Sequence, residues 1–597
     1  MPPLMSPVRI SLLTAALAVV CASSSAQEQI LKHDYERAGD TSVEIQSIFG
    51  TAARHGALPF RVIIRNNTGS DRVWTVRLNE GYSGRKLRTE STYRFAVENA
   101  SEVEHGIVFQ FGPSFAAYDF RNLEIVVSSP GLKTVNRNHG EQTNQSFPFL
   151  AISKPLAQKS LSALDDAVEK GGSNDHYFAK PFDPAFLPSD WLGYTALDFL
   201  LLDLESWTSL QVIQRKSILS WVRLGGNLEV YIPDGGTLDY LDIESLPLLE
   251  DAKSARLSLG TITVRGWFKG LLPESTIKRY ESHTTRSAEL DGSYGSNWTL
   301  AKALDPKDFN PVLIFILLAA FAIIVAPVNL FIFAKSGQRH RLFITTPIIS
   351  VVACLLIVAF IFFKDGLGGQ GLRVVFADLQ SEPGEMQIYT TQEQVSRTGV
   401  MMNSGFENES QLALDPVKLP DSAFNALSGR SRRSTVYNFS GNDFSGGFFR
   451  SRSEQGFAIE NAQPTRSRVE LIAKASDNAP PQLVSNLAFP IREFFYLGEG
   501  DTIWQSEAKT TVAPGNIIPL TAVSRLDFEN WFDRNMDGYS IPLGKKVRDL
   551  RSEPNRFFAI PVNPSDLTIP THPSIEWENR AILLSGKVLN ATPASDE

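Results

Sequence analysis

Three carboxylates flank one short apolar segment of the chain. The stretch DFLLLDLE places Asp198 before residues 199–202, and Asp203 and Glu205 after them. A short apolar run is typical of a buried strand, and an open α/β sheet carries its functional groups beyond the carboxyl ends of its strands. Carboxylates there are either ligand-binding groups or the turn and cap residues that usually follow a strand. The candidate ligand-binding residues are Trp191, Tyr194, Asp198, Asp203 and Glu205.

A second stretch, DRNMDG, resembles the start of a calcium-binding loop. Asp533, Asn535 and Asp537 alternate as the first oxygen ligands of such a loop do. The twelfth position, where a bidentate Glu is needed, is Gly544, and Pro542 lies inside the loop. A polar turn that ends a helix explains the same residues. No cofactor is therefore expected, with Ca²⁺ as the alternative at these three positions.

Other reactive groups are scarce. The two cysteines, Cys21 and Cys354, both lie in apolar runs, and residues 27–310 contain neither Cys nor a G-x-S-x-G motif. The eight histidines form no metal-binding spacing, and the net charge of −8 gives no nucleic-acid signature. We therefore expect no catalytic residues and no nucleic-acid partner.

One basic run leaves two interpretations open. SGRSRRS contains Arg430, Arg432 and Arg433, and Arg450 and Arg452 follow in the sequence. Such a run is either a solvated loop or a surface that contacts anionic lipid or wall polymer.

The elements that would position the strand-end carboxylates follow an α/β pattern. Apolar strands are predicted at residues 147–152, 199–202 and 228–232, and helices at 155–170 and 209–225 between them. This alternation favours a parallel sheet covered by helices, here a domain over residues 146–300 that ends in a linker. In the second helix the spacing directs one set of apolar residues to the core: Val212, Ile213, Ile218, Leu219 and Val222.

Both flanking regions alternate as β-strands do. Phe60, Val62 and Ile64 share one face of a predicted strand, and strands of this length between Gly, Asn, Ser and Pro turns indicate an Ig-like β-sandwich over residues 27–145. In the next strand Trp74, Val76 and Leu78 oppose Val73, Thr75 and Arg77. Residues 364–597 are predicted to be mainly β, with one helix at Arg525–Asn535.

Three apolar runs predict export and membrane attachment. Residues 1–26 resemble a cleavable signal peptide ending at Ala26, although an uncleaved anchor helix is also open. Residues 311–334 and 345–363 are each uncharged and long enough to cross a bilayer. Within residues 311–334, Pro327 and Asn329 favour a tolerated kink with a helix–helix hydrogen bond.

The loop between the two spans predicts their orientation. Residues 335–344 contain Lys335, Arg339 and Arg341 and no acid, and short basic loops stay in the cytoplasm. Residues 27–310 and 364–597 would therefore both lie outside the cytoplasm, as the signal peptide also predicts.

The whole plan resembles a group of uncharacterised bacterial membrane proteins. The segment DWLGYTALDFLLLDLESWTSLQVIQRKSILSWVRLGGNLEVYI is similar to a class I glutamine-amidotransferase-like fold, and APVNLFIFAKSGQRHRLFITTPI is similar to the span–loop–span segment of these proteins. The resemblance implies a flavodoxin-like or amidotransferase-like α/β domain between exported β domains. It implies no reaction, because the catalytic Cys of true amidotransferases is missing.

These observations predict a non-enzymatic protein of the bacterial inner membrane, with a β-sandwich, an α/β domain, two transmembrane helices and a C-terminal mainly-β domain. Its partners would be the bilayer and other envelope proteins, recognised through loops and sheet edges. The alternative is an exported hydrolase or transferase with a carboxylate site in the α/β domain. A transporter is disfavoured, because the spans contain one Asn as their only strongly polar group.

Overall fold

A computed structural model of the chain separates into two compact units that divide at Thr285 and Arg286. Two short segments, residues 85–91 and 112–115, belong to the second unit. The structure describes residues 28–590 except 36–38, 82–86, 116–117, 145–146, 171–178, 244–245, 247–251, 268–271, 273, 305–310, 334–336, 338, 383–384, 421–435, 476–479, 508–509 and 564. The predicted signal peptide, Lys335 and the arginines 430, 432 and 433 lie outside the described residues.

The first unit begins with two antiparallel sheets. The strands of one sheet, in spatial order, are β1 Glu28–Asp34, β2 Ser42–Ser47, β3 Ala57–Asn66 and β6 Ser101–Gln110. The other sheet contains β4 Arg72–Gly81, β7 Tyr118–Ser128 and β8 Val135–Asn144, with β5 Leu87–Val97 beside β4. The consecutive strands β3 and β4 lie in different sheets, as expected for a sandwich.

The alternation predicted for these strands is confirmed. Phe60, Val62 and Ile64 of β3 are fully buried. In β4, Trp74 is fully buried while its neighbour Val73 is 48% exposed. The period of two therefore places one face of each strand in the core between the sheets.

A six-stranded sheet follows in the same unit. Its order is β10 Ala179–Phe182, β9 Leu150–Ser153, β11 Phe199–Asp203, β12 Asn227–Pro233, β14 Gly260–Trp267 and β13 Ser254–Leu257. All pairs are parallel except β13 with β14. The three predicted strands are therefore present, and they are neighbours in one parallel sheet.

Helices pack against this sheet. Leu156 and Leu164 of α2 Lys154–Lys170 and Tyr280 of α5 Glu274–Glu281 join one buried cluster with Leu150 and Leu201 of the strands. The alternate residues Ala151, Leu200 and Val230 are also fully buried, so that both faces of the sheet are covered.

The prediction for the second helix is wrong at its start. This helix is α4 Val212–Arg223, and Val212 and Ile213 are 83% and 49% exposed. Ile218 and Val222 are fully buried as predicted, and Leu219 is half-buried. Gln214 and Ser217 face inward instead, because Gln214 donates to the carbonyl of Leu187 and Ser217 to that of Ser189.

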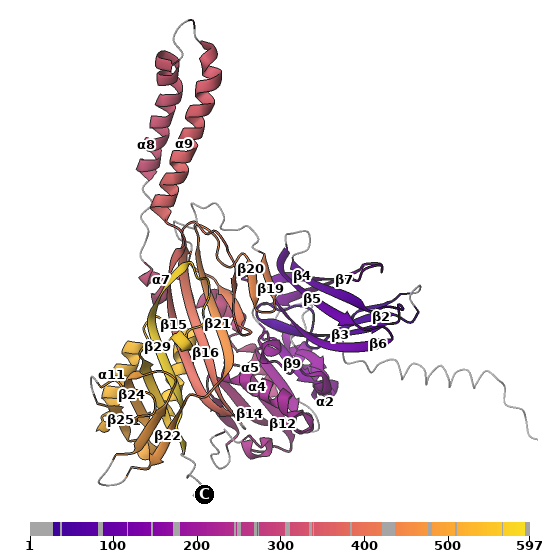
Figure 1. Ribbon diagram of the computed structural model, residues 1–597. Coiled ribbons are helices and arrows are strands. Elements are labelled where there is room, and N and C mark those ends of the chain that lie inside the picture. The colour runs from indigo at the N-terminus through magenta and orange to yellow at the C-terminus, as the bar shows by residue number, and fades with distance from the viewer. Residues whose placement is uncertain are drawn as a thin grey trace, which may run out of the picture. The chain divides into compact units, whose positions relative to one another are not determined.

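The second unit contains a nine-stranded sheet whose central strands are long. Figure 1 shows β15, β16, β21 and β29 lying side by side. β15 Gly369–Glu382 pairs antiparallel with β16 Glu385–Thr398 and parallel with β29 Ile575–Lys587. The order is β18 Ala413–Val417, β21 Glu454–Thr465, β16, β15, β29, β28 Arg556–Pro561, β24 Ile491–Leu497, β25 Ile503–Ser506 and β27 Leu520–Val523.

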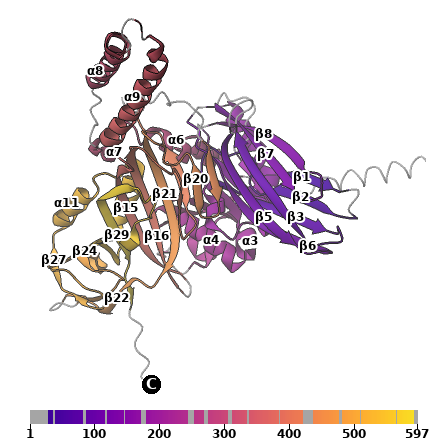
Figure 2. The same ribbon diagram turned by 45° about the horizontal axis from the view of Figure 1, so that its top comes forward.

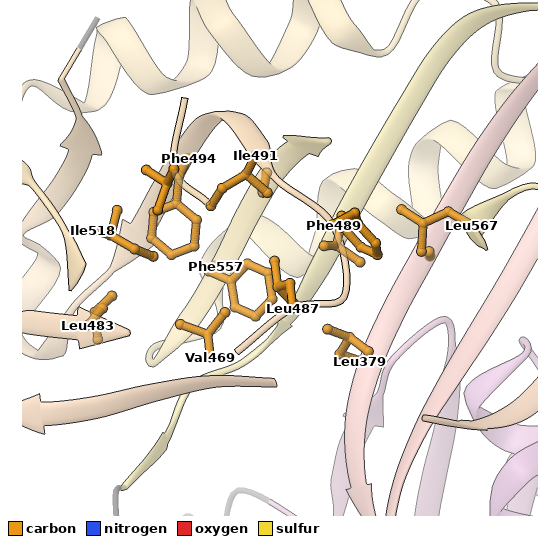
Figure 3. Packing of buried hydrophobic residues seen from close by; sticks show 14 of the residues in the cluster. Leu379, Val469, Leu483, Leu487, Phe489, Ile491, Phe494, Ile518, Phe557 and Leu567 are labelled. Carbon is orange, nitrogen blue, oxygen red and sulfur yellow. The ribbon is translucent and has the colours of Figure 1, made fainter. Parts of the chain in front are cut away.

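A smaller sheet covers part of the nine-stranded one. It contains β26 Ile517–Ile518, β23 Gln482–Asn486, β22 Arg468–Ala473 and β30 Leu589–Asn590. Figure 3 shows its Val469, Leu483 and Ile518 packed against Phe494 and Phe557 of the larger sheet. The rings of Phe494 and Phe557 stack at a centroid distance of 5.4 Å. The C-terminal region is thus mainly β, as predicted.

The helices and short strands of this unit lie around the large sheet. The predicted helix at Arg525–Asn535 is confirmed as α11, and α12 Ile541–Asp549 follows it. Trp531 of α11 packs on Phe495 of β24, with ring centroids 4.4 Å apart. The short strands are β17 Phe406–Glu407, β19 Tyr437–Ser440 and β20 Asp443–Gly446.

Two apolar helices form a hairpin between Ala303 and Gly369 of the second unit. The first begins as α8 Pro311–Ile323 and continues as a π-helix, η4 Ile324–Phe333. The second is α9 Leu342–Asp365, preceded by the short η5 Arg339–Arg341. Figures 1 and 2 both show α8 and α9 side by side.

Candidate functional site

Asp203 is a structural cap. The carboxylate is buried at the end of β11 and begins α3 Leu204–Ser209. Its Oδ2 accepts from the backbone N–H of Ser206 at 3.1 Å. Its Oδ1 accepts from the hydroxyls of Ser206 and Ser153 at 2.5 and 2.8 Å. These bonds satisfy the start of α3 and join it to the end of β9, which leaves the carboxylate engaged within the fold.

The other two carboxylates do not converge on Asp203. Asp198 lies before β11, where its Oδ2 accepts from the N–H of Phe149 at 2.8 Å. The five residues of β11 place Asp198 and Asp203 at opposite ends of the strand, about 16 Å apart. Glu205 is exposed in the first turn of α3. The three carboxylates thus build no shared ligand site.

Trp191 and Tyr194 belong to a short 3-10 helix, η2 Trp191–Tyr194, that is packed into the core. The Tyr194 hydroxyl donates to the carbonyl of Pro188 at 2.8 Å, and burial raises the pKa of Tyr194 well above its ordinary value. Asp190 caps the helix through the N–H of Leu192. Both aromatic residues therefore pack in the core of this domain.

A polar cluster that the sequence analysis missed surrounds Glu229 of β12. This buried carboxylate accepts from the Tyr231 hydroxyl at 3.0 Å, from the Tyr280 hydroxyl at 2.5 Å and from Arg265 Nε at 3.0 Å. Arg279 of α5 also donates to it. Burial raises the pKa of Tyr231 to about 12 and that of Tyr280 further. Four donors occupy the carboxylate, so the cluster holds α5 on the sheet. The only sign of this cluster in the sequence was a single acidic residue, Glu229, within an apolar strand.

The calcium-like residues are spread along the end of α11 and the turn after it. Asp533 is exposed and pairs with Arg548 at 3.5 Å. The Asn535 side chain donates to the carbonyl of Trp531 at 2.9 Å, and Asp537 is exposed in the turn. Gly538 follows with a φ of 96°. The geometry fits the polar helix end that the sequence offered as the alternative, since Asn535 is engaged by its own helix.

The apolar hairpin exposes large apolar side chains on both of its helices. Of the described helices, one is long and apolar enough to cross a membrane: Arg339–Ala359 has a mean hydropathy of 2.6, and none of it is buried. The first predicted span contains a shorter apolar stretch, Leu318–Ile332. Phe331 of this stretch and Phe315, which precedes it in α8, are each 72% exposed. Large exposed apolar surfaces of this kind mark contact with a membrane or another protein.

Two residues, Pro327 and Asn329, mark the first helix of the hairpin. Pro327 lies four residues after Ile323, where α8 ends and the wider π-helical turns of η4 begin. A proline ring cannot fit against the carbonyl four residues earlier in a regular α-helix, which is consistent with this change. Asn329 is fully buried between the helices and donates to the Thr346 hydroxyl at 2.9 Å. The predicted helix–helix hydrogen bond is therefore observed, and near Pro327 the first helix changes from α to π turns. Arg339 and Arg341 are exposed at the end of the hairpin where η5 lies.

The segment before the hairpin belongs to the unit that follows it. We name residues 286–303, with α6 Arg286–Gly292 and α7 Thr299–Ala303, the pre-hairpin segment. Its Trp298 is 2% exposed and donates to the carbonyl of Gly538 at 2.9 Å. The N–H of Gly538 donates in turn to the Thr299 hydroxyl at 3.0 Å. A linker was expected here, but the segment is folded against residues more than two hundred positions later.

Buried charge strengthens this attachment. The Tyr294 hydroxyl donates to Glu393 of β16 at 2.7 Å, and Arg286 pairs with Glu460 of β21 at 3.3 Å. The other oxygen of Glu393 accepts from the N–H of Ser540 at 2.7 Å. Burial raises the pKa of both glutamates, and Arg286 opposes that rise. The pre-hairpin segment is thus joined to β16 and to its neighbour β21.

Comparisons with known proteins identify no family for this chain. The sequence matches no protein-family model and no curated protein. Among solved structures, the ApaA protein of Bordetella pertussis is similar over 18% of this chain and 93% of its own, at 8% identity and a TM-score of 0.13. A β-glucuronidase of Bacteroides uniformis is similar over 32% of this chain and 23% of its own, at 9% identity and a TM-score of 0.15. A β-glucuronidase of Parabacteroides merdae covers 95% of this chain and 65% of its own, with a TM-score of 0.13. At these scores none of the likenesses bears on fold or function.

Proposed function

We propose that this chain is a non-enzymatic protein of a bacterial inner membrane, held by the hairpin and presenting both folded units outside the cytoplasm for contact with other envelope components. The observation that carries the proposal is the pre-hairpin segment. Trp298 and Tyr294 precede the hairpin, and their partners Gly538 and Glu393 follow it. Segments that hydrogen-bond to each other must lie on the same side of a bilayer, so a spanning hairpin has to cross it twice.

Charge and length support the same topology. The helix α9 has 24 residues, about 36 Å at 1.5 Å per residue, which exceeds the hydrocarbon thickness of about 30 Å. Arg339 and Arg341 lie at the end of the hairpin away from the folded unit, and basic residues favour the cytoplasmic side.

The non-enzymatic part of the proposal is supported by the α/β domain. Its strand-end carboxylate Asp203 is used as a cap, and Asp198 lies at the other end of β11. An exported hydrolase or transferase would need groups that converge near a reacting atom.

Labelling with a membrane-impermeant maleimide tests the topology. Single cysteines replace exposed residues in a background with Cys21→Ser and Cys354→Ser: Lys32→Cys in the first unit, His340→Cys in the hairpin loop and Lys474→Cys in the second unit. We expect Lys32→Cys and Lys474→Cys to react in intact spheroplasts, and His340→Cys only after permeabilisation. Reaction at His340→Cys alone in intact spheroplasts overturns the proposal.

A further inference from the structure

Three backbone segments are tied together where α9 ends. The helix ends at Asp365, and residues 366–368 immediately pair with residues 399–400. The Gly368 N–H donates to the carbonyl of Val400 at 3.0 Å, and the Gly399 N–H to that of Gly368 at 2.7 Å. The third segment, 450–453, joins through the Arg452 N–H, which donates to the carbonyl of Gly399 at 2.8 Å.

This junction presents apolar side chains to the outside. Leu367 is 68% exposed and Met402 is 89% exposed. The neighbouring Met401 points the other way and packs on the aromatic cluster that contains Phe406 and Phe448. The Met401 N–H donates to the Ser451 hydroxyl at 2.9 Å. Met402 is thus held outward by an ordered loop rather than placed on a free tail.

The turn at the junction is fixed as well. Gly366 and Gly368 have φ values of 75° and 82°, which favour glycine. A Cβ on Gly368 would lie 2.1 Å from the carbonyl oxygen of Ser574. The direction in which the chain leaves α9 is therefore set by backbone packing, and with it the position of Leu367.

Positive charge lies beside the apolar pair. Arg452 is exposed at a left-handed position, φ 55°, on the segment that pairs with Gly399, and Arg450 is half-buried two residues earlier. Amphipathic surfaces of this composition, with large apolar groups next to basic ones, bind the headgroup layer of anionic membranes.

We propose that Leu367, Met402 and Arg452 form a contact surface for the outer leaflet of the membrane that the hairpin crosses, with a preference for anionic lipid headgroups. The inference rests on the proposed function, because the membrane-spanning hairpin determines how far this contact surface lies from the bilayer. The helix α9 ends at Asp365, and two extended residues reach Leu367 within about 7 Å of that end. That distance brings Leu367 to the headgroup layer, whose depth is about 5 to 8 Å on each side of the hydrocarbon.

The surface has a consequence for the second unit. A folded unit held by the single connection at the end of α9 could tilt together with that helix, whereas a second contact with the bilayer beside the helix end restrains the tilt. Leu367, Met402 and Arg452 would fix the orientation of the nine-stranded sheet relative to the bilayer.

Depth-dependent quenching of a fluorescent label tests this contact in the full chain. Bimane is attached at Met402→Cys in the Cys21→Ser, Cys354→Ser background, and the protein is reconstituted in vesicles of phosphatidylcholine and phosphatidylglycerol. Headgroup-nitroxide lipid should quench this label at least about twofold more than a label at Leu526→Cys. Leu526 is the matched control, because it is 65% exposed in α11 of the same unit.

A third label separates the two proposals. Bimane on the native Cys354, exposed on α9, reports whether the hairpin is in the hydrocarbon. Equal quenching at positions 402 and 526, with Cys354 quenched by chain-nitroxide lipid, overturns the surface and leaves the membrane hairpin standing. Absence of quenching at Cys354 overturns both.

Charge variants test the lipid preference. Arg452→Gln should lower the quenching at position 402 by about twofold in vesicles that contain phosphatidylglycerol, because it removes a basic side chain that an anionic surface attracts. Arg492→Gln, at a side chain 60% exposed on β24, is the matched control. The same quenching in phosphatidylcholine alone, unaffected by Arg452→Gln, overturns the anionic preference.

Discussion

At the scale of single residues, Asp203 shows how one side chain supports two interpretations. Its place after an apolar strand was predictable, and so were both roles that such a carboxylate can take. The choice depends on Ser153 and Ser206, which donate hydroxyls to it. Ser153 is fifty positions away in the sequence, so no local pattern could reveal that contact.

Replacing Asp203 should therefore cost stability. We expect Asp203→Ala to lower the free energy of unfolding by about 1 to 3 kcal/mol, because it removes a helix cap and leaves the Ser153 hydroxyl without an acceptor. Hydrogen–deuterium exchange at residues 204–209 should rise in the same variant. Glu205→Gln, on an exposed residue of the same helix, should change the free energy by less than about 0.5 kcal/mol. Unchanged exchange in Asp203→Ala, together with a lost cellular phenotype, would instead favour the exported-enzyme alternative.

A second residue-scale prediction concerns pH. Burial raises the pKa of Glu393 and Glu460 above the ordinary carboxyl value of 4.5. The folded state therefore retains protons at pH values at which the unfolded chain has lost them. The contribution of these groups to the free energy of unfolding is largest below pH 4.5. It falls as the pH rises through their raised pKa values.

Glu460→Gln removes one of these titrations and retains an acceptor for Arg286. Urea unfolding between about pH 4 and pH 7 should show a shallower fall in stability for this variant than for the unmodified chain. Glu499→Gln, at a side chain 65% exposed, should leave the slope unchanged. A steeper slope in Glu460→Gln would contradict the assignment.

At the scale of elements, the strength of the sequence signal decided which predictions succeeded. The alternation in β3 and β4 and the residue pattern of α11 were sufficient, because burial on one face dictates them. The same reasoning failed for α4, where Val212 and Ile213 are exposed. Periodicity identifies an apolar stripe, but it does not show that Gln214 and Ser217 find buried carbonyls and take the inward positions.

The pre-hairpin segment makes the hairpin an insertion between parts of one folded unit. A chain cut in the hairpin loop should therefore remain associated. We expect that, after a protease site is inserted behind Gly337 and cleaved in detergent, the two fragments elute together on size exclusion. The contacts of Trp298 and Tyr294 with the later part of the chain hold them.

Trp298→Ala separates this attachment from helix pairing within the hairpin. Loss of a fully buried indole costs about 3 to 5 kcal/mol, so the cleaved variant should dissociate at a lower urea concentration. Leu526→Ala, on an exposed residue, provides the comparison. Equal dissociation of all cleaved forms would show that the pre-hairpin segment does not hold the fragments together.

At the scale of the whole molecule, composition and order of elements were predictable: β-rich flanks, a parallel sheet between them and an apolar hairpin. The division between the two units was not. It falls at Arg286, before α6 and α7, while the sequence suggested a domain end near residue 300. The segment between carries Tyr294 and Trp298 in a Gly- and Ser-rich stretch that resembles a linker, and its partners lie beyond two apolar helices. Only these long-range contacts show that the pre-hairpin segment belongs to the second unit.

One pairing in the large sheet constrains the order of biosynthetic events. β15 lies between β16 and β29, and residues 383–574 separate it from its β29 neighbour in the sequence. At ribosomal rates of 5–20 residues per second, about 10 to 40 s pass between synthesis of the two strands. During that interval the edge of β15 that β29 covers in the folded sheet is open, and open edges recruit foreign strands. Under the topology proposed above, a holding chaperone outside the cytoplasm would cover this edge until β29 is made.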